Sequence, residues 1–281
     1  TVRAWDPDTG ARGGFAARVA GPLTQLQQIK TGAAPQGGLT VHDRLEDALR
    51  GAVLIQENAP ENIPLKHQLY AQIEAAVPRD VIIASSTSAH PWSDLVPGMR
   101  SPDRLITAHP FNPPHLVPLV ELYGPDPKVV DWAEAFYRSL GSAPVRLKKD
   151  AVGHIANRLS SALWREAVHI VADGIADVDA VDMALVNGPG LRWSVLGAHM
   201  AYHLGGGVGG MAGYLEHLGP SQQKRWDSLG SPTLDADTRA RLVEGVNTEA
   251  AGRSITQLEA ERDAALIELA QMRQRLAAQK D

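Results

Sequence analysis

The chain has 281 residues, of which 44% are hydrophobic and 21% charged, and this composition excludes disordered, collagen-like and disulfide-stapled proteins. Its 27 Lys and Arg against 32 Asp and Glu give a formal net charge of -5 without a basic block, so a small ligand is favoured over nucleic acid. The absence of Cys excludes thiol nucleophiles and Cys-ligated zinc, and makes the cytoplasm the default location. The apolar runs are far shorter than the roughly 20 residues of a membrane-spanning helix, so no membrane contact is expected.

The first 150 residues switch repeatedly between strand-like and helical patterns. Short runs of β-branched and apolar residues predict strands at 2–5, 39–42, 53–56, 81–85, 105–108, 117–122 and 145–147. Helical patterns lie between them, at 43–50, 65–77 and 129–140. This alternation is typical of βαβ units and predicts an α/β domain with a largely parallel sheet over residues 1–150. The chain opens within a strand and without Met, so we expect a preceding N-terminal element.

From residue 151 the strand patterns stop, which predicts a second, all-α domain over 151–281. The expected helices are 155–172, 178–186, 195–204, 210–218, 238–248 and 254–278. The last helix carries its apolar residues on one face, so it should pack along one stripe against its own domain or a second subunit. His199 and His203 are four residues apart on one helix, but no third ligand lies at a supporting spacing, so no metal site is expected.

Asp6 stands at the end of the first predicted strand. In a dinucleotide-binding fold, an acid at the end of the second strand accepts hydrogen bonds from the adenosine ribose and favours NAD over NADP. The alternative is that Asp6 caps the next helix. The glycine loop that would support the first interpretation would lie before Thr1. A G-x-G-x-x-G run at Gly205, Gly207 and Gly210 follows a helical pattern, not a strand, and is not assigned as a phosphate loop.

Polar side chains gather at the ends of the central strands. A Ser-Thr-Ser run at 86–88 follows one strand, His109 leaves the next into a Pro-rich turn, and Glu121 lies in the strand after that. Glu121 could reach the second ring nitrogen of His109, which would make a general base with an orienting carboxylate. The hydroxyls at 86–88 and the amide of Asn112 could bind a substrate oxygen. The alternative is a buried His that is satisfied within a tight turn.

Together with the run Gly-His-Ile-Ala-Asn-Arg-Leu that starts at Gly153, these motifs resemble the L-3-hydroxyacyl-CoA dehydrogenase superfamily in order and spacing. The resemblance implies a Rossmann-type NAD-binding domain whose first strand and glycine loop are missing from this chain, followed by an all-α domain. It also implies that His109 is the catalytic base and that Glu121 orients it. Ser88 and Asn157 match the residues that contact substrate and nicotinamide.

The same resemblance implies a set of cofactor contacts. Asp6 matches the acid that binds the adenosine ribose, and Glu61 and Lys66 match an E-N-x-x-x-K motif that contacts the cofactor ribose. Asn112 is placed with this group. One departure is Ser86, which stands where the family's turn usually has Asn and puts any contact made by that amide in question.

Motifs in the second domain narrow the resemblance. The runs beginning at Gly188, Gly206 and Gly252 resemble the branch that contains carnitine 3-dehydrogenase, with gulonate 3-dehydrogenase and lambda-crystallin. The resemblance implies NAD-dependent oxidation of L-carnitine to 3-dehydrocarnitine by a homodimer. The alternatives are L-gulonate, 3-hydroxybutyrate or a 3-hydroxyacyl-CoA as substrate, or a non-catalytic, crystallin-like structural dimer.

Carnitine carries a quaternary ammonium, which aromatic faces would bind well. Phe111, Trp164, Trp193 and Tyr202 are candidates for such a wall, although large aromatics more often serve core packing. Arg192 could pair with the substrate carboxylate, or it could lie at the surface or between the domains.

Overall fold

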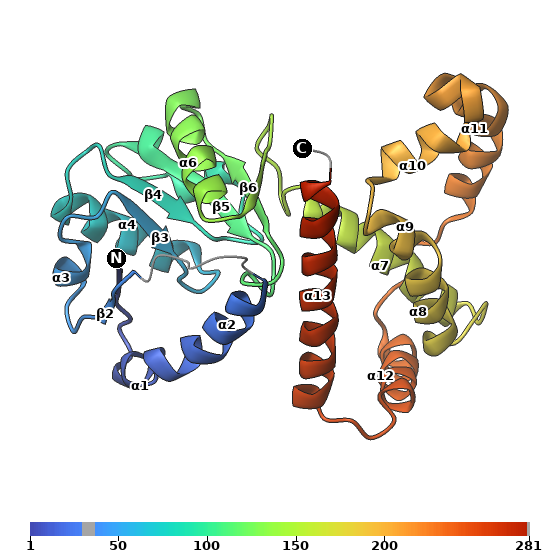
Figure 1. The fold of residues 1–281 in the computed structure, drawn as a ribbon, viewed down its shortest axis with the longest axis horizontal. Coiled ribbons are helices and arrows are strands. Elements are labelled where there is room, and N and C mark those ends of the chain that lie inside the picture. Colours follow the sequence, from blue (N-terminus) through green and yellow to red (C-terminus); the bar gives the residue numbers. More distant parts are fainter. Residues whose placement is uncertain (30–36, 280–281) are drawn as a thin grey trace. The chain divides into compact units, whose positions relative to one another are not determined.

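The computed structural model describes residues 1–29 and 37–279. It divides into two compact units (Figure 1). One comprises residues 1–158 with 263–278, and the other comprises residues 159–262 with Gln279. Within the described residues, no helix is both long enough and apolar enough to cross a membrane.

The described part of the first unit contains a five-stranded sheet of order β3-β4-β5-β6-β7. Its strands are β3 (Leu54–Glu57), β4 (Ile82–Ser85), β5 (Leu105–Pro110), β6 (Leu119–Tyr123) and β7 (Ala143–Arg146). Strands β3, β4 and β5 run parallel, β6 is antiparallel to β5, and β7 is parallel to β6. Strands β1 (Val2–Ala4) and β2 (Leu39–Val41) form a separate parallel pair. Every predicted strand is present, with ends that agree within about two residues.

Helices cover both faces of the five-stranded sheet (Figure 1). In chain order, the helices that lie wholly within residues 1–158 are α1 (Thr9–Gly13), α2 (Phe15–Ile29), α3 (Leu45–Leu49), α4 (Ile63–Ala76), α5 (Trp92–Leu95) and α6 (Pro127–Ser139). Because successive strand residues point to opposite faces, Ile82 packs with Ala133 of α6, whereas Ile83 packs with Tyr70 of α4. This buried alternation confirms the Rossmann-type α/β fold that the sequence predicts.

Two features of the first unit differ from the sequence prediction. Helices α1, α2 and α5 were not predicted: α1 and α5 have only five and four residues, and the α2 segment lacks a clear apolar period and contains Pro22, which normally interrupts a helix. Helix α13 (Ile255–Ala278) was assigned to the second domain, but it buries Ile267 against Ile29 of α2 and Leu116. The later part of α13 therefore completes a small core in the first unit.

The second unit is helical, as predicted. It contains most of α7 (Ala156–Ala172), then α8 (Val178–Asn187), α9 (Pro189–Trp193), α10 (Ala198–Gly205), α11 (Gly210–Ser228) and α12 (Ala236–Ala250). The buried apolar side chains described in this unit are few: Val168, Val171, Val178 and Tyr214. Its own core is therefore thin for a unit of this length.

The glycine run at 205–210 forms the tight connection between α10 and α11. A Cβ on Gly206 would overlap the carbonyl oxygen of Gly210, and Gly210 itself has a φ of 55°, so glycine is required for packing and conformation. The Nδ1 atom of His203 accepts the backbone N–H of Met211 at 3.1 Å. The run thus connects two helices and does not follow a strand, as the glycine loop of a dinucleotide-binding fold does.

Candidate active site

The predicted pair of His109 and Glu121 meets across two antiparallel strands. The register of β5 and β6 places these two residues directly opposite each other, so their side chains lie on the same face of the sheet. His109 Nδ1 lies 3.0 Å from Glu121 Oε2, and the two side chains are only 7% and 1% exposed. The strand register therefore produces the arrangement that the spacing of twelve residues suggested.

Glu121 also fixes the start of α7 with its other oxygen. Its Oε1 accepts the backbone N–H groups of Ile155 at 2.7 Å and Ala156 at 2.9 Å. Burial alone would raise the pKa of Glu121, but the hydrogen bond from His109 and these backbone donors hold it below its ordinary value. An ionised Glu121 only accepts, so Nδ1 of His109 carries the hydrogen of this bond, and in the neutral ring Nε2 is the nitrogen that can accept a proton. Within the described residues, Nε2 makes no hydrogen bond.

The turn that follows β4 is held by the carboxylate of Glu61. Glu61 accepts the backbone N–H of Ser88 at 2.6 Å, the Ser88 hydroxyl at 3.0 Å and the Thr87 hydroxyl at 2.9 Å. Burial raises the pKa of Glu61. These hydrogen bonds and the charge of Lys66 lower it by more than burial raises it, so the pKa of Glu61 lies below its ordinary value. On the other side, Asn157 Nδ2 donates to the Ser88 carbonyl at 3.1 Å. The turn is thus fastened both to the segment that precedes α4 and to α7.

A buried ion pair lies beneath this turn. Lys66 Nζ is 2.9 Å from Glu57 Oε1 and 3.7 Å from Glu61 Oε2, and the Lys66 side chain is only 1% exposed. Glu57 also accepts the hydroxyls of Tyr70 and Ser85, each at 2.7 Å. Burial and the charge of Glu57 raise the pKa of Tyr70. Glu57 is not among the site residues predicted from the sequence, although an acid at a strand end nine residues before Lys66 was an available signal.

The Ser that departs from the family's turn has a structural partner. The hydroxyl of Ser86 lies 2.8 Å from the carbonyl oxygen of Glu57 and 2.8 Å from Oδ1 of Asn58. The backbone N–H of Ser86 donates to the same carbonyl at 2.9 Å. Ser86 therefore connects the turn to the end of β3.

Other predicted residues in the first unit lie near strand ends. Asn112 is exposed in the turn after β5, where the Asn112–Pro113 peptide is cis. The ring of Phe111 meets the ring of His109 edge-on, with centroids 6.2 Å apart. Asp6 follows β1 and accepts the backbone N–H of Asp8 at 2.8 Å, while Asp8 is the residue that caps α1.

The remaining candidates belong to the second unit. Trp164 on α7, Arg192 and Trp193 on α9, and Tyr202 on α10 are all exposed. The Tyr202 ring also packs against the buried ring of Tyr214, with centroids 4.9 Å apart. These four residues belong to the second unit, whereas the His109 cluster belongs to the first.

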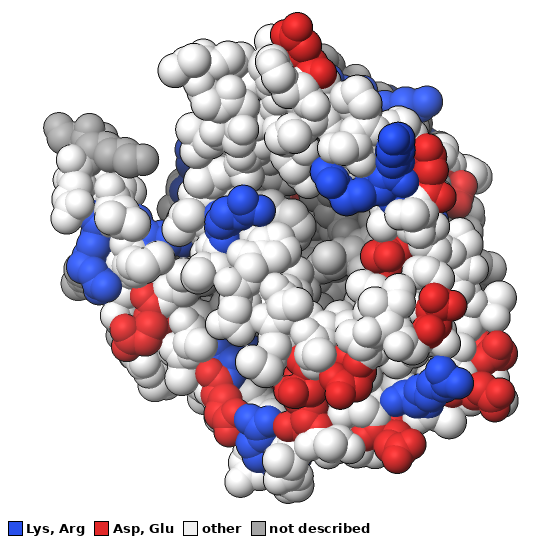
Figure 2. All heavy atoms as spheres, turned by 90° about the vertical axis from the view of Figure 1, so that its right-hand side faces the viewer, with Lys and Arg blue, Asp and Glu red and all other residues white. Residues whose placement is uncertain are grey.

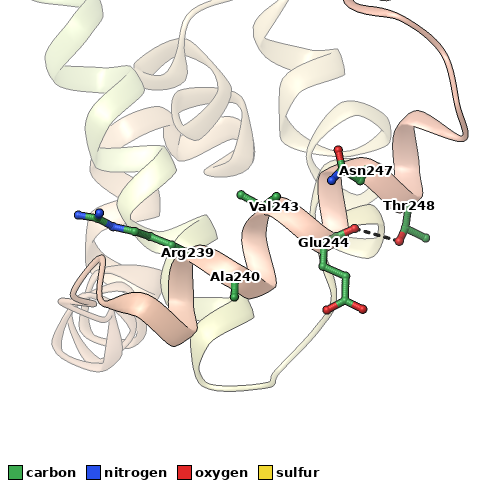
Figure 3. A pocket seen from close by; sticks show the side chains of 6 residues that line it. All are labelled: Arg239, Ala240, Val243, Glu244, Asn247 and Thr248. Atoms are coloured by element: carbon green, nitrogen blue, oxygen red, sulfur yellow. Dashed lines mark hydrogen bonds between the residues drawn. The ribbon is translucent and has the colours of Figure 1, made fainter.

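A surface hollow in the second unit runs along one side of α12 (Figure 3). It is lined by six exposed residues of that helix: Arg239, Ala240, Val243, Glu244, Asn247 and Thr248. The Thr248 hydroxyl donates to the Glu244 carbonyl at 2.9 Å, an ordinary contact within a helix. None of the predicted site residues lines this hollow, so we do not assign it as the active site.

Comparison with known proteins identifies the family. The model of the 3-hydroxyacyl-CoA dehydrogenase NAD binding domain matches residues 17–151, and the model of the C-terminal domain matches residues 153–236. The L-carnitine dehydrogenase of Nocardiopsis dassonvillei is 44% identical over 273 residues, which are 96% of this chain and 83% of that protein. The chain belongs to the 3-hydroxyacyl-CoA dehydrogenase family.

Further comparisons place the chain within this family. The L-carnitine dehydrogenase of Pseudomonas aeruginosa is 41% identical, covering 95% of this chain and 84% of that protein. The crystal structure of 5-formyl-3-hydroxy-2-methylpyridine 4-carboxylic acid 5-dehydrogenase, an NAD+-dependent dismutase, has a TM-score of 0.83 at 28% identity, covering 97% and 90% of the two chains. As a family member, the chain is an NAD-dependent dehydrogenase of a small-molecule substrate. These findings confirm the family, enzyme class and cofactor predicted from the sequence.

Proposed function

We propose that this dehydrogenase oxidises the 3-hydroxyl of L-carnitine to 3-dehydrocarnitine, with His109 as the general base. The observation that carries the proposal is the His109 ring, which has Nδ1 held by ionised Glu121 at 3.0 Å and Nε2 without a partner among the described residues. The L-carnitine dehydrogenases that are 44% and 41% identical to this chain support the choice of substrate.

In this mechanism His109 removes the proton of the substrate hydroxyl through Nε2. Glu121 keeps the hydrogen on Nδ1 and stabilises the positive charge that the ring gains. The backbone donors of Ile155 and Ala156 occupy the other Glu121 oxygen, so Glu121 keeps its charge and orientation during the transfer. NAD, when bound, supplies the hydride acceptor. A base placed in this way accelerates a reaction by about 100- to 10,000-fold.

Ser88 and Asn157 are proposed to contact the reacting oxygen and the nicotinamide. This proposal is supported by the position of the two residues next to each other, because Asn157 Nδ2 donates a hydrogen bond to the Ser88 carbonyl at 3.1 Å. The Ser88 hydroxyl donates to Glu61, so its oxygen remains an acceptor for a substrate or cofactor donor.

The described residues also fit a dinucleotide, because carboxylates follow the C-terminal ends of two strands that belong to parallel pairs. Asp6 follows β1 and Glu61 follows β3, and the Glu61 side chain is 36% exposed, which leaves room for a ribose hydroxyl. The exposed amide of Asn112 is the third proposed contact. Lys66 is proposed to act through Glu61, since its ammonium is enclosed by Glu57 and Ala59.

The proposed substrate contacts suit the two charged ends of carnitine. Arg192 would pair with the carboxylate, and the exposed faces of Trp164, Trp193 and Tyr202 would receive the quaternary ammonium. Phe111 is proposed as a further aromatic contact for the substrate, and its edge contact with the ring of His109 supports a place near the base.

A substrate panel tests the proposed function. NADH formation is followed by absorbance with L-carnitine, D-carnitine, L-gulonate and 3-hydroxybutyryl-CoA, and the intact mass of the protein is recorded in parallel. We expect turnover on L-carnitine and little on the other three. Faster turnover on gulonate or the thioester would reassign the substrate while leaving the dehydrogenase class intact.

We also propose that the chain forms a homodimer through its helical unit. Large apolar side chains that are more than 60% exposed are numerous there: Leu159, Ile175, Val186, Leu191 and Leu204 are examples. Uncharged residues cover much of the face seen in Figure 2, with Lys, Arg, Asp and Glu scattered among them. Large exposed apolar side chains in this number favour a protein partner. Light scattering should give twice the chain mass of 30.1 kDa, and a monomer mass would contradict the dimer.

A further inference from the structure

A second imidazole, that of His154, lies against the ring of His109 and has no part in the mechanism above. The two ring centroids are 5.1 Å apart with 35° between the planes, and His154 is 2% exposed. Its backbone has a φ of 49°, in the left-handed region that a residue other than glycine seldom adopts. Neighbouring Gly153 has a φ of 72°. A conformation of this kind persists only where the surroundings impose it, and it is often found at active sites.

The hydrogen bond of His154 defines its tautomer. Nε2 lies 2.9 Å from the carbonyl oxygen of Thr87. A carbonyl can only accept, so Nε2 of His154 carries a hydrogen and donates it. The two residues that follow, Ile155 and Ala156, are those whose backbone N–H groups hold Glu121. His154 therefore stands between the turn after β4, the carboxylate of Glu121 and the ring of His109.

We propose that His154 is a positioning residue, whose flat ring holds the imidazole of His109 in the orientation that faces Glu121. Rings with centroids about 4.5 to 7 Å apart pack favourably and limit each other's rotation. Phe111 meets the same His109 ring edge-on at 6.2 Å, so the imidazole is enclosed by two aromatic neighbours. The inference rests on the proposed role of His109 as the base, and it adds the residue that keeps the base aligned.

Three substitutions separate the ring of His154 from its hydrogen bond. His154→Phe keeps an aromatic ring and loses the donor, His154→Gln keeps a donor of similar reach and loses the ring, and His154→Ala loses both. We expect His154→Phe to retain kcat within about threefold of the wild type, because alignment is preserved. His154→Gln and His154→Ala should lose roughly 10- to 100-fold in kcat, because a misaligned base reacts slowly. The KM for NAD should stay within about threefold in all three, since His154 is not among the proposed cofactor contacts.

Thermal unfolding of each variant is measured alongside kcat and KM. A kcat for His154→Gln that equals or exceeds that of His154→Phe would show that the hydrogen bond to Thr87, not the ring, matters, and would overturn the proposal. If His154→Phe is too unstable to assay, the kcat of folded His154→Gln tests the proposal by itself. An unchanged kcat in that variant would contradict a role for the ring. A parallel His109→Gln variant tests the proposed base separately from the proposed positioning residue. Full activity in that variant would refute the base, whereas full activity in His154→Gln alone would refute only the positioning role.

Discussion

At the residue scale, one carboxylate serves both the base and the helix that follows. Glu121 holds His109 with one oxygen and the first backbone donors of α7 with the other. Each of its oxygens is engaged, so the carboxylate has little freedom to rotate away from the imidazole. This double use explains how a single Glu orients the ring of His109 near the end of the central strand β5.

Replacing the proposed base should remove turnover and spare the cofactor. His109→Gln cannot accept a proton at the position of Nε2, so kcat should fall by about 100- to 10,000-fold. The affinity for NAD should change little, because His109 is not among the proposed cofactor contacts. NADH formation measures the first quantity and titration calorimetry with NAD measures the second. A rate close to that of the wild type would mean that another group is the base.

At the scale of elements, the turn after β4 gains its shape from helices on both sides. Glu61, just before α4, holds the backbone and hydroxyl of Ser88. On the other side the turn is held by Asn157 of α7 and by His154, which lies two residues before α7. The buried pair of Glu57 and Lys66 lies under the same turn and contacts Glu61. A change in that pair should therefore affect both the stability of the first unit and the turn.

Breaking the buried pair should be costly. Lys66→Met leaves Glu57 buried without its cation, and loss of one partner of a buried pair destabilises a protein by about 3 to 5 kcal/mol. The free energy of unfolding, measured by urea denaturation, should fall by that amount. The matched control is Arg50→Met, which breaks the exposed pair with Asp47 and should leave stability nearly unchanged. Equal effects of the two substitutions would contradict the importance of burial here.

At the scale of the whole molecule, stability should depend on acid through the carboxylates of the site. Glu61 and Glu121 both have a folded-state pKa below the ordinary 4.5. A lowered pKa stabilises the folded chain at any pH above the unfolded value, and this contribution disappears as the pH falls through the lower folded value. The free energy of unfolding should therefore hold near neutrality and fall below about pH 4.5.

The variant Glu121→Gln tests how much the Glu121 carboxylate contributes to the loss of unfolding free energy at low pH. It cannot titrate, so its stability should fall less steeply than that of the wild type between pH 4.5 and pH 3. Urea denaturation at a series of pH values gives both slopes. Identical slopes would mean that Glu121 does not contribute to the acid sensitivity.

The sequence by itself determined the order of elements and the main pair of the site. Strand and helix patterns are local, so periodicity sufficed to predict β1 to β7 and most of the helices. His109 and Glu121 were also within its reach, because both lie in consecutive strands and the resemblance supplied their roles. Helix α2 was missed because Pro22 obscures its pattern.

Only the tertiary structure decided which distant residues meet. Three contacts join segments that are not related by any local periodicity in the sequence. They are the packing of α13 on α2, the ion pair of Lys66 with Glu57, and the ring contact of His154 with His109. Such contacts depend on strand register and on the way that helices cover the sheet, and both are set by the burial of apolar surface over the whole unit. The sequence thus determined the elements and the chemistry of the site, and the packing of distant segments determined how that chemistry is held in place.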